Sequence, residues 1–393
     1  MAQEGLRYTD GYANSSVCSP TRFALATGRW QHRLRGGADE PIASRTARGD
    51  PALGLPPAHP TFASLLRDAG YATALVGKWH LGFLPHFGPL KSGYSEFFGP
   101  MSGGVDYFTH CDSAGKHDLY EGETEVERPG YLTDLLSEKS VSFVERQRGH
   151  PFLLSLHYTA PHWPWESRED EAEARRIKSI VHTDGGSVDT YLAMIGHMDE
   201  GIGRVLDALR RTGVDQNTLV VFTSDNGGER FSDTWPLVGK KMDLLEGGIR
   251  VPYVARWPGR IPAGKSTPQL AITMDWAATF LAAAGVAPHP DYPLDGIDLL
   301  GAPVERDLFW RMKHREQKAV RSGHWKWLSV DGYEYLFDLS RDQRERANLA
   351  QREPQRLAEL KRRYTAWEKE LPPIPAEARV SHAYGPADMP PAS

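Results

Sequence analysis

The segment VCSPTR occupies residues 17–22 and is followed by FALATGR at residues 23–29. The second run has helical character. Pro20 is expected at the first position of the helix that continues into this run. A proline costs no hydrogen bond at that position, because the N–H group that it lacks would have no partner there. Cys18 is therefore predicted at a helix N-terminus, which attracts anions and lowers the pKa of a thiol. Arg22 follows one turn later as a forked donor for an oxyanion. The plain alternative for Cys18 is an inert core thiol.

The composition is that of an ordinary globular protein. The 393 residues are 40% hydrophobic and 25% charged, and the net charge is −5. This balance predicts no nucleic-acid or membrane partner, and no apolar run has the length of a membrane span. The two cysteines, Cys18 and Cys111, show no metal-binding spacing, so a disulfide is not expected. We expect a soluble protein that is cytoplasmic or, with an export signal upstream of Met1, periplasmic or secreted.

Helix-like and strand-like runs alternate along the chain as far as Gly285. The predicted helices cover residues 61–69, 131–147, 187–212 and 275–284, and the predicted strands cover residues 71–76, 151–158 and 218–223. Such alternation predicts an α/β fold with a large, mostly parallel sheet between helices. The three strands are each followed by polar residues: first Lys78 and His80, then His162, then Asp225 with Asn226. Because ligands bind outside the carboxyl ends of parallel strands, we expect these residues to converge on one cleft.

The C-terminal part of the chain has a different pattern. A Pro-rich linker at residues 287–293 precedes short strand-like runs and a charged helix over residues 354–371. These predict a small antiparallel sheet with one helix packed on it. The predicted domains are therefore a catalytic α/β domain at residues 1–290 and a small α+β subdomain with a tail at residues 291–393.

Three local predictions concern less regular segments. Residues 1–4 are predicted to be the last turn of a helix, closed by Gly5 in the left-handed cap conformation. Residues 31–58 are rich in Gly, Pro and Arg and are predicted as a long surface loop. Residues 249–252, after a Glu-Gly-Gly sequence, are predicted to begin a core strand.

The polar residues at the strand ends suit specific chemistry, although each also has an ordinary structural explanation. Lys78 could be a surface charge and His80 or His162 a loop histidine, but an ammonium also holds oxyanions and an imidazole transfers protons. Asp225 and Asn226 could form a turn, but a carboxylate beside an amide oxygen also suits calcium or magnesium.

Taken in order, these motifs resemble those of the type I sulfatases, the arylsulfatase-like branch of the alkaline phosphatase superfamily. The resemblance rests on CSPTR at residues 18–22, GKWH at residues 77–80, the Asp225-Asn226 pair, and the block from WPLVGKK at residues 235–241 to LEGG at residues 245–248. It implies an alkaline-phosphatase-like fold, conversion of Cys18 to formylglycine by a formylglycine-generating enzyme, and a Ca²⁺ or Mg²⁺ ion.

The resemblance also implies a role for each motif residue. The metal ligands would be Asp225, Asn226 and the modified Cys18. Arg22, Lys78 and Lys241 would stabilise the charge of the transferring group, with Lys240 as the alternative to Lys241. His162 would protonate the departing alcohol, and His80 would act as the base that regenerates the nucleophile. The substrate would be a sulfated small molecule or glycan.

One family feature is missing from the sequence. Family members begin with a core strand that ends in two metal-binding aspartates, and Asp10 is no substitute for them. The interpretation is that the sequence starts at an internal methionine of a longer protein or is a shortened homologue, so activity of this chain is doubtful. The alternatives are a phosphonate or phosphate monoester hydrolase on the same scaffold, an inactive pseudo-sulfatase that binds sulfated ligands, and a cysteine hydrolase with an unmodified thiolate.

Overall fold

The structure is a computed structural model in which residues 1–382 are described, so the end of the predicted tail lies outside the described residues. The chain forms two compact units. Unit 1 contains Met1–Pro41, Leu219–Ala282 and the described chain from Pro293 onward, and unit 2 contains Ile42–Thr218 and Ala283–Tyr292. The predicted boundary near residue 290 concerns functional domains and stays a prediction.

A mixed four-stranded sheet lies in unit 1. Its order is β10 (Lys265–Thr267), β1 (Leu6–Tyr8), β9 (Tyr253–Arg256) and β8 (Val220–Thr223). β1 is parallel to β10 and antiparallel to β9, which is also antiparallel to β8. Next along the chain, β2 (Gly11–Tyr12) pairs in parallel with β11 (Ala271–Ile272). The helices of this unit are α1 (Cys18–Thr27), α7 (Glu246–Ile249), α9 (Pro354–Glu368) and most of α8 (Asp275–Ala284).

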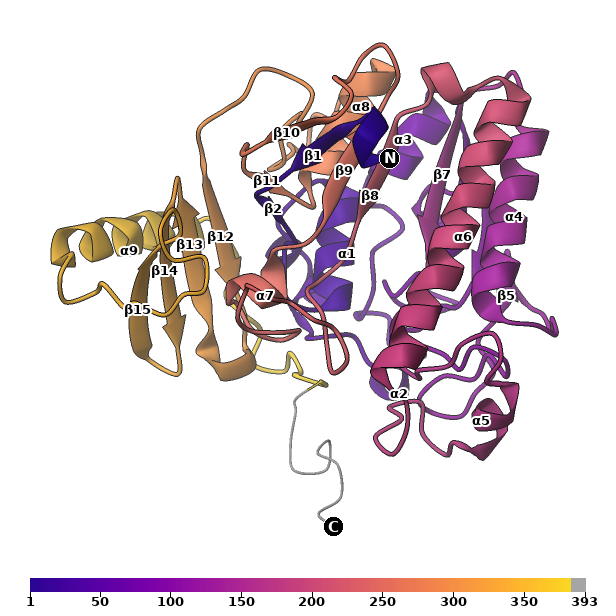
Figure 1. The fold of residues 1–393 in the computed structure, drawn as a ribbon, viewed down its shortest axis with the longest axis horizontal. Helices are drawn as coiled ribbons and strands as arrows, with labels where there is room; N and C mark the ends of the chain where they lie inside the picture. The colour runs from indigo at the N-terminus through magenta and orange to yellow at the C-terminus, as the bar shows by residue number, and fades with distance from the viewer. Residues whose placement is uncertain (383–393) are drawn as a thin grey trace. The chain divides into compact units, whose positions relative to one another are not determined.

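The C-terminal part of unit 1 is the small antiparallel sheet that the sequence predicted. Its strands follow one another as β12 (Asp307–Arg311), β13 (Lys318–Ser322), β14 (Trp325–Val330) and β15 (Tyr333–Asp338). Helix α9 lies along β13 and β14 (Figure 1). Aromatic rings pack between this helix and the sheet. The ring of Trp327 on β14 contacts Tyr364 at 5.1 Å between centroids, and the ring of Phe309 on β12 stacks on Trp367 at 5.0 Å.

Unit 2 is organised around a five-stranded sheet. Its order is β6 (Thr124–Glu125), β5 (Tyr120–Glu121), β4 (Glu96–Gly99), β3 (Ala72–Gly77) and β7 (Phe152–His157). β3 pairs in parallel with both β4 and β7, and its central residues are buried, as expected for a continuous apolar run. The helices are α2 (Ser44–Ala47), α3 (Phe62–Asp68), α4 (Leu132–Arg146), α5 (Glu171–Arg176) and α6 (Val188–Thr212). α4 and α6 pack side by side (Figure 1).

The long predicted helices and strands are all present within a few residues of their expected bounds. Several of the local predictions differ from the structure. Gly5 is extended, with φ −145°, after a 3₁₀ turn at Ala2–Glu4, so the predicted left-handed cap is wrong. Helix α1 begins at Cys18, which makes Pro20 the third helical residue and not the first. That position still lies in the first turn, where the missing N–H needs no partner.

The predictions for residues 31–58 and 249–252 also need correction. The first segment contains 3₁₀ turns at Gln31–Arg33 and Arg35–Ala38 and the short helix α2, and its residues 36–40 are buried. Gly, Pro and Arg therefore mark tight turns over residues 31–47, whereas residues 48–58 contain no helix or strand and include exposed positions, as expected for a surface loop. Glu246–Ile249 form the helical turn α7, and the strand starts only at Tyr253. Within residues 1–382, no helix combines the length and apolar character needed to cross a bilayer.

Candidate active site

Cys18 lies at the N-terminus of α1, as the sequence predicted, although it is the first residue of the helix and does not precede it. It is buried, with 2% of its surface exposed. The approach to this helix is fixed by Thr21. Its hydroxyl donates a hydrogen bond to the carbonyl of Ser15 and accepts one from the N–H of Ser15, both at 3.0 Å. This pair joins the chain before the helix to its first turn. The position of Cys18 relative to the free N–H groups of the helix is therefore set by the threonine of the motif.

Arg22 and Asp225 are brought together in unit 1. The Nε–H group of Arg22 donates to Oδ2 of Asp225 at 2.8 Å, and their side chains are 10% and 24% exposed. Arg22 lies one turn after Cys18 on α1, whereas Asp225 follows β8, so the contact joins two motifs that are far apart in the sequence. An arginine held by a carboxylate keeps its planar group in a fixed orientation, which is what recognition of an oxyanion requires.

The segment that carries Lys241 is fixed through its backbone. The N–H of Lys241 donates to the carbonyl of Gly228 at 2.8 Å, and the next N–H, of Met242, donates to the carbonyl of Ser16 at 2.9 Å. Met242 has a φ of 77°, an unfavourable conformation for a residue with a side chain, and it requires support from its surroundings. Lys241 is thereby fixed both to the loop after β8 and to the chain that leads into Cys18.

The side chain of Lys241 is buried and faces negative groups. Burial lowers the pKa of this ammonium, but the charges of Cys18, Glu229 and Asp225 and a hydrogen bond with Cys18 outweigh burial, so the pKa is raised. Nζ lies 4.0 Å from Oε2 of Glu229, a residue that the sequence reasoning missed. Lys240, the alternative, is exposed. The geometry therefore favours Lys241 as the lysine that faces position 18.

Two glycine-containing segments meet beside this lysine. The N–H of Gly227 donates to the carbonyl of Gly248 at 2.8 Å, and the N–H of Gly247 donates to the carbonyl of Val238 at 2.7 Å. A Cβ atom on Gly227 would lie 2.0 Å from the carbonyl oxygen of Gly247, which no side chain could tolerate. The two backbone segments can approach this closely because glycine stands at these positions.

Asp225 and Asn226 offer oxygen atoms of the kind that calcium and magnesium bind. Nδ2 of Asn226 donates to the carbonyl of Gly227 at 2.8 Å, while Oδ1 is buried and accepts no hydrogen bond. However, within residues 1–382 no three His, Cys, Asp or Glu side chains gather as they would around a metal ion. Calcium takes six to eight oxygen ligands. The donor chemistry therefore fits a divalent ion, but these residues by themselves do not complete its site.

In unit 2, Lys78 and His80 follow β3. Both are buried, and the backbone around them is fixed: the N–H of Lys78 donates to the carbonyl of His157 at 2.8 Å, and that of His80 to the carbonyl of Met101 at 3.0 Å. Nε2 of His80 lies 2.7 Å from the carbonyl oxygen of Ile42. Because a carbonyl only accepts, the proton of the neutral ring is on Nε2, and Nδ1 carries the lone pair.

His162 lies after β7 and is held on both sides of its peptide. Its N–H donates to the carbonyl of Thr159 at 2.9 Å, and its carbonyl accepts from the hydroxyl of Tyr107 at 3.0 Å. Nδ1 lies 2.8 Å from the carbonyl oxygen of Trp163, so this nitrogen carries a proton. In the neutral ring, Nε2 then carries the lone pair. In the imidazolium, Nε2 carries the second proton of the ring.

A pair of glycines connects the two histidines. A Cβ atom on Gly103 would lie 2.3 Å from Cε1 of His80, and one on Gly104 would lie 3.0 Å from the ring of His162. The two imidazoles thus contact neighbouring residues of one backbone segment, a placement that the sequence reasoning missed. The signal for it was the Gly-Gly sequence after β4, which leaves room for two rings to approach the chain.

The predicted site residues therefore form two groups. Unit 1 brings together Cys18, Arg22, Asp225 and Lys241, with Asn226 adjacent to Asp225, and unit 2 brings together His80 and His162, with Lys78 two residues before His80. The convergence of both groups on one cleft stays a prediction.

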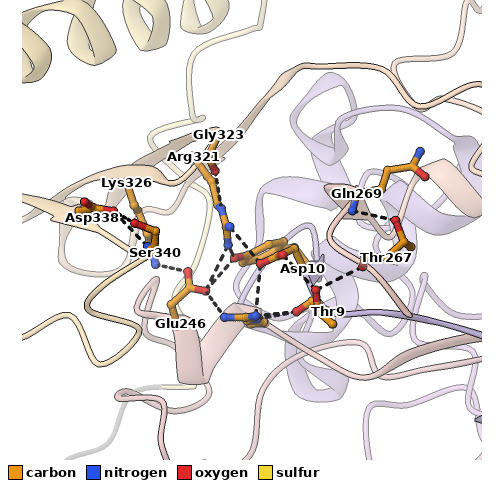
Figure 2. Close-up of polar contacts among 12 residues, drawn as sticks. Thr9, Asp10, Glu246, Thr267, Gln269, Arg321, Gly323, Lys326, Asp338 and Ser340 are labelled. Atoms are coloured by element: carbon orange, nitrogen blue, oxygen red, sulfur yellow. Dashed lines mark hydrogen bonds and ion pairs between the residues drawn. The ribbon is translucent and has the colours of Figure 1, made fainter. Parts of the chain in front are cut away.

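A buried charged network, also missed by the sequence reasoning, supports the lysine segment. Glu246, five residues after Lys241, contacts Nζ of Lys326 through Oε1 at 2.9 Å and accepts a hydrogen bond from Tyr12 through Oε2 at 2.7 Å. Lys326 also lies 2.8 Å from Oε1 of Glu345, whose pKa is raised by burial. Figure 2 shows Lys326 of β14 extending toward Glu246 at the start of α7. The small sheet thereby supports the end of the segment that carries Lys241.

A sequence model of the sulfatase family matches residues 1–286. The chain belongs to the sulfatase family. Among curated relatives of this sulfatase chain, the N-acetylgalactosamine-6-sulfatase of Sus scrofa is 31% identical over 369 residues, which cover 84% of this chain and 66% of that protein. The arylsulfatase of Hemicentrotus pulcherrimus is 30% identical over 357 residues, which cover 83% of this chain and 61% of that protein. The chain thus spans less than two thirds of the length of these relatives.

Among solved structures, the sulfatase chain is similar to Ps i-CgsB in complex with k-i-k-neocarrahexaose. The two are 30% identical with a TM-score of 0.83, and the match covers 94% of this chain and 86% of that one. The alkaline-phosphatase-like α/β fold class with a small antiparallel sheet is confirmed by this similarity.

Proposed function

We propose that this member of the sulfatase family hydrolyses sulfate monoesters with a nucleophile at position 18. The observation that carries the proposal is the meeting, within unit 1, of a helix N-terminus at Cys18, the buried ammonium of Lys241 and the Arg22–Asp225 pair. The tetrahedral anion of a sulfate ester needs several donors on different sides. These elements supply backbone N–H groups, an ammonium and a guanidinium around one side chain.

The nucleophile would be formylglycine, made from Cys18 by a formylglycine-generating enzyme. Its hydrated aldehyde supplies the attacking hydroxyl group when the modification is present. Asp225 and Asn226 would give two oxygen ligands to a Ca²⁺ or Mg²⁺ ion, whose charge would stabilise the sulfate group. The buried Oδ1 atom of Asn226, which accepts no hydrogen bond, supports this assignment. The remaining ligands are not supplied by the motif residues described here.

The residues of the chain would hold negative charge on the transferring group. Lys241 and Arg22 of unit 1 and Lys78 of unit 2 would be the three cationic donors; all three belong to the predicted motifs, and both lysines are buried. Donors that are fixed before the reaction stabilise developing charge without further reorganisation. In many enzymes this stabilisation is the largest contribution to the rate enhancement. The backbone hydrogen bonds of the Lys241 and Lys78 segments support this role, because they fix both lysines on rigid loops.

The two histidines would move the protons. The imidazolium of His162 would give its Nε2 proton to the ester oxygen as the alcohol leaves, while the lone pair on Nδ1 of His80 would accept a proton from the nucleophile. Over one cycle, a sulfate ester and one water molecule become an alcohol and hydrogen sulfate. The hydrogen bonds that define the tautomers of both rings support these assignments.

The proposed substrates are sulfated glycans or small aryl sulfates. The printed names of relatives include an N-acetylgalactosamine-6-sulfatase and an arylsulfatase, and one similar structure holds a neocarrahexaose. Phosphonate and phosphate monoesters carry a similar anion, so they are the substrates against which selectivity has to be measured.

The decisive experiment is peptide mass spectrometry on protein from its native host. Trypsin releases residues 8–22, which contain Cys18, and residues 92–116, which contain Cys111 as an internal control. Formylglycine lowers the mass of the first peptide by about 18 Da and leaves the second unchanged. Hydrolysis of 4-nitrophenyl sulfate and of a phenyl phosphonate ester is then compared on the same sample. An unmodified Cys18 in every preparation, with no sulfate release, contradicts the proposal.

A further inference from the structure

Trp235 is a large aromatic side chain that the fold leaves 68% exposed. It lies in unit 1, in the loop between Asn226 and Lys241, six residues before the lysine. A single exposed aromatic side chain is common on protein surfaces and is not by itself a binding site, so the surroundings of Trp235 decide whether it marks one. The proposed hydrolysis of sulfate esters uses no atom of this residue.

The indole is held on a tight turn. The N–H of Trp235 donates to Oδ1 of Asp233 at 2.9 Å, and the N–H of Leu237 donates to the carbonyl of Thr234 at 2.8 Å. The guanidinium of Arg344 lies over the ring, 4.2 Å from its centroid. Arg344 therefore covers one face of the indole, and the large exposed fraction leaves the other face open.

Arg344 is itself held in place through its neighbour. Glu345 has a φ of 51°, and its carboxylate accepts the N–H of Glu246 at 2.7 Å and contacts Nζ of Lys326 at 2.8 Å. The buried network described above thus fixes the turn that presents Arg344. Within residues 1–382, no carboxylate pairs with Arg344, and its Nε atom is buried without a hydrogen-bond partner, so its charge is available to an anion. Both partners, Trp235 and Arg344, are connected to the segment that carries Lys241.

We propose that Trp235 and Arg344 form a subsite for a second sugar residue of a sulfated glycan. This proposal rests on the proposed function and narrows its substrate class to oligosaccharides. The open indole face would stack on the apolar face of a sugar ring, as aromatic side chains do with flat partly apolar groups. The guanidinium of Arg344 would bind a sulfate group of that sugar through two N–H donors.

The test compares an oligosaccharide with a substrate that has no second sugar. The variants are Trp235→Ala and Arg344→Ala, and the matched control is Tyr333→Ala, which removes another exposed aromatic side chain (71% exposed) from the same unit. For each protein, kcat/KM for the k-i-k-neocarrahexaose is divided by kcat/KM for 4-nitrophenyl sulfate. This quotient should fall about tenfold in both variants, because KM for the hexasaccharide rises, and it should stay unchanged in the control.

Binding of the hexasaccharide to the same proteins by isothermal titration calorimetry gives a readout that does not need turnover. A weaker affinity in both variants, at unchanged thermal stability, supports the subsite even if sulfate release is absent and the proposed function fails. Equal losses on both substrates, or hexasaccharide binding that is absent from the wild type or insensitive to both substitutions, overturn the proposal.

Discussion

The ammonium of Lys326 lies 2.9 Å from Oε1 of Glu246, and neither side chain is accessible to solvent. The same ammonium lies 2.8 Å from Oε1 of Glu345. One cation on β14 of the small sheet therefore serves two buried carboxylates, one of which begins α7 beside the segment that carries Lys241. This arrangement couples the folding of the C-terminal sheet to the geometry of the candidate active site.

Lys326→Met should destabilise the protein by about 3–5 kcal/mol, because it removes the ammonium that lies 2.9 and 2.8 Å from the buried carboxylates of Glu246 and Glu345. Glu246 keeps the more distant guanidinium groups of Arg250 and Arg321, at 3.6 and 3.7 Å. The matched control is Lys318→Met on the neighbouring strand. The side chain of Lys318 is 39% exposed and lies 3.2 Å from Glu368, so its loss should cost less than about 1 kcal/mol. Urea unfolding followed by tryptophan fluorescence measures both values. Similar losses for the two variants would contradict the role given to Lys326.

Lys241→Met should lower kcat/KM for 4-nitrophenyl sulfate by about 10²–10³, since it removes a fixed donor to developing negative charge. Lys240→Met is the control, because Lys240 is adjacent in sequence but exposed, and its loss should change kcat/KM less than about threefold. Steady-state kinetics at one pH, with circular dichroism to verify folding, decides between the two lysines. A larger loss from Lys240→Met reverses the assignment.

The sequence predicted the elements of the fold well because their signals are local. The segments of α4 and α6 show helical periodicity, and the segment of β3 is a continuous apolar run. Both signals come from adjacent residues, so the bounds of these elements could be placed within a few positions. The candidate nucleophile was equally accessible, since its helix N-terminus is a local feature of residues 17–22. Gly5 and the residues 31–47 were misjudged because distant contacts override local preference there. Residues 36–40 are buried by the fold although their composition is typical of a loop.

The partners of the site residues could not be predicted, because they come from distant parts of the chain. Nothing in the sequence places Lys326 against Glu246, eighty positions earlier, or aligns Gly103 with the ring of His80. Such pairs depend on packing between elements, which a single sequence does not encode in any spacing. Glu229 illustrates the same point, because only the fold brings it near the ammonium of Lys241.

His162→Ala should affect substrates according to their leaving groups. A general acid matters most when the departing oxygen is a strong base, so hydrolysis of an alkyl sulfate should fall about 10²–10⁴-fold, and that of 4-nitrophenyl sulfate much less. His150→Ala, at an exposed position of the same unit, should leave both rates unchanged. Rates on a series of sulfate esters with leaving groups of increasing pKa test this. Equal losses across the series would show that His162 acts by another route.

Glu166→Gln should remove a pH dependence of stability. Burial, followed by the charge of Asp106, raises the pKa of Glu166 from 4.5 to about 9, so the folded protein holds a proton there that the unfolded chain releases. Between these values the free energy of unfolding should fall by about 1.4 kcal/mol for each pH unit of increase. The window from pH 7.5 to 8.5 lies above the pKa of about 7 of the buried Glu40 and the pKa of about 6 of the buried Asp118, and urea unfolding in this window should show this slope in the wild type. The slope should persist in the exposed control Glu138→Gln and vanish in Glu166→Gln, whose amide replaces the neutral carboxyl. A slope that survives in Glu166→Gln would mean that another group releases the proton.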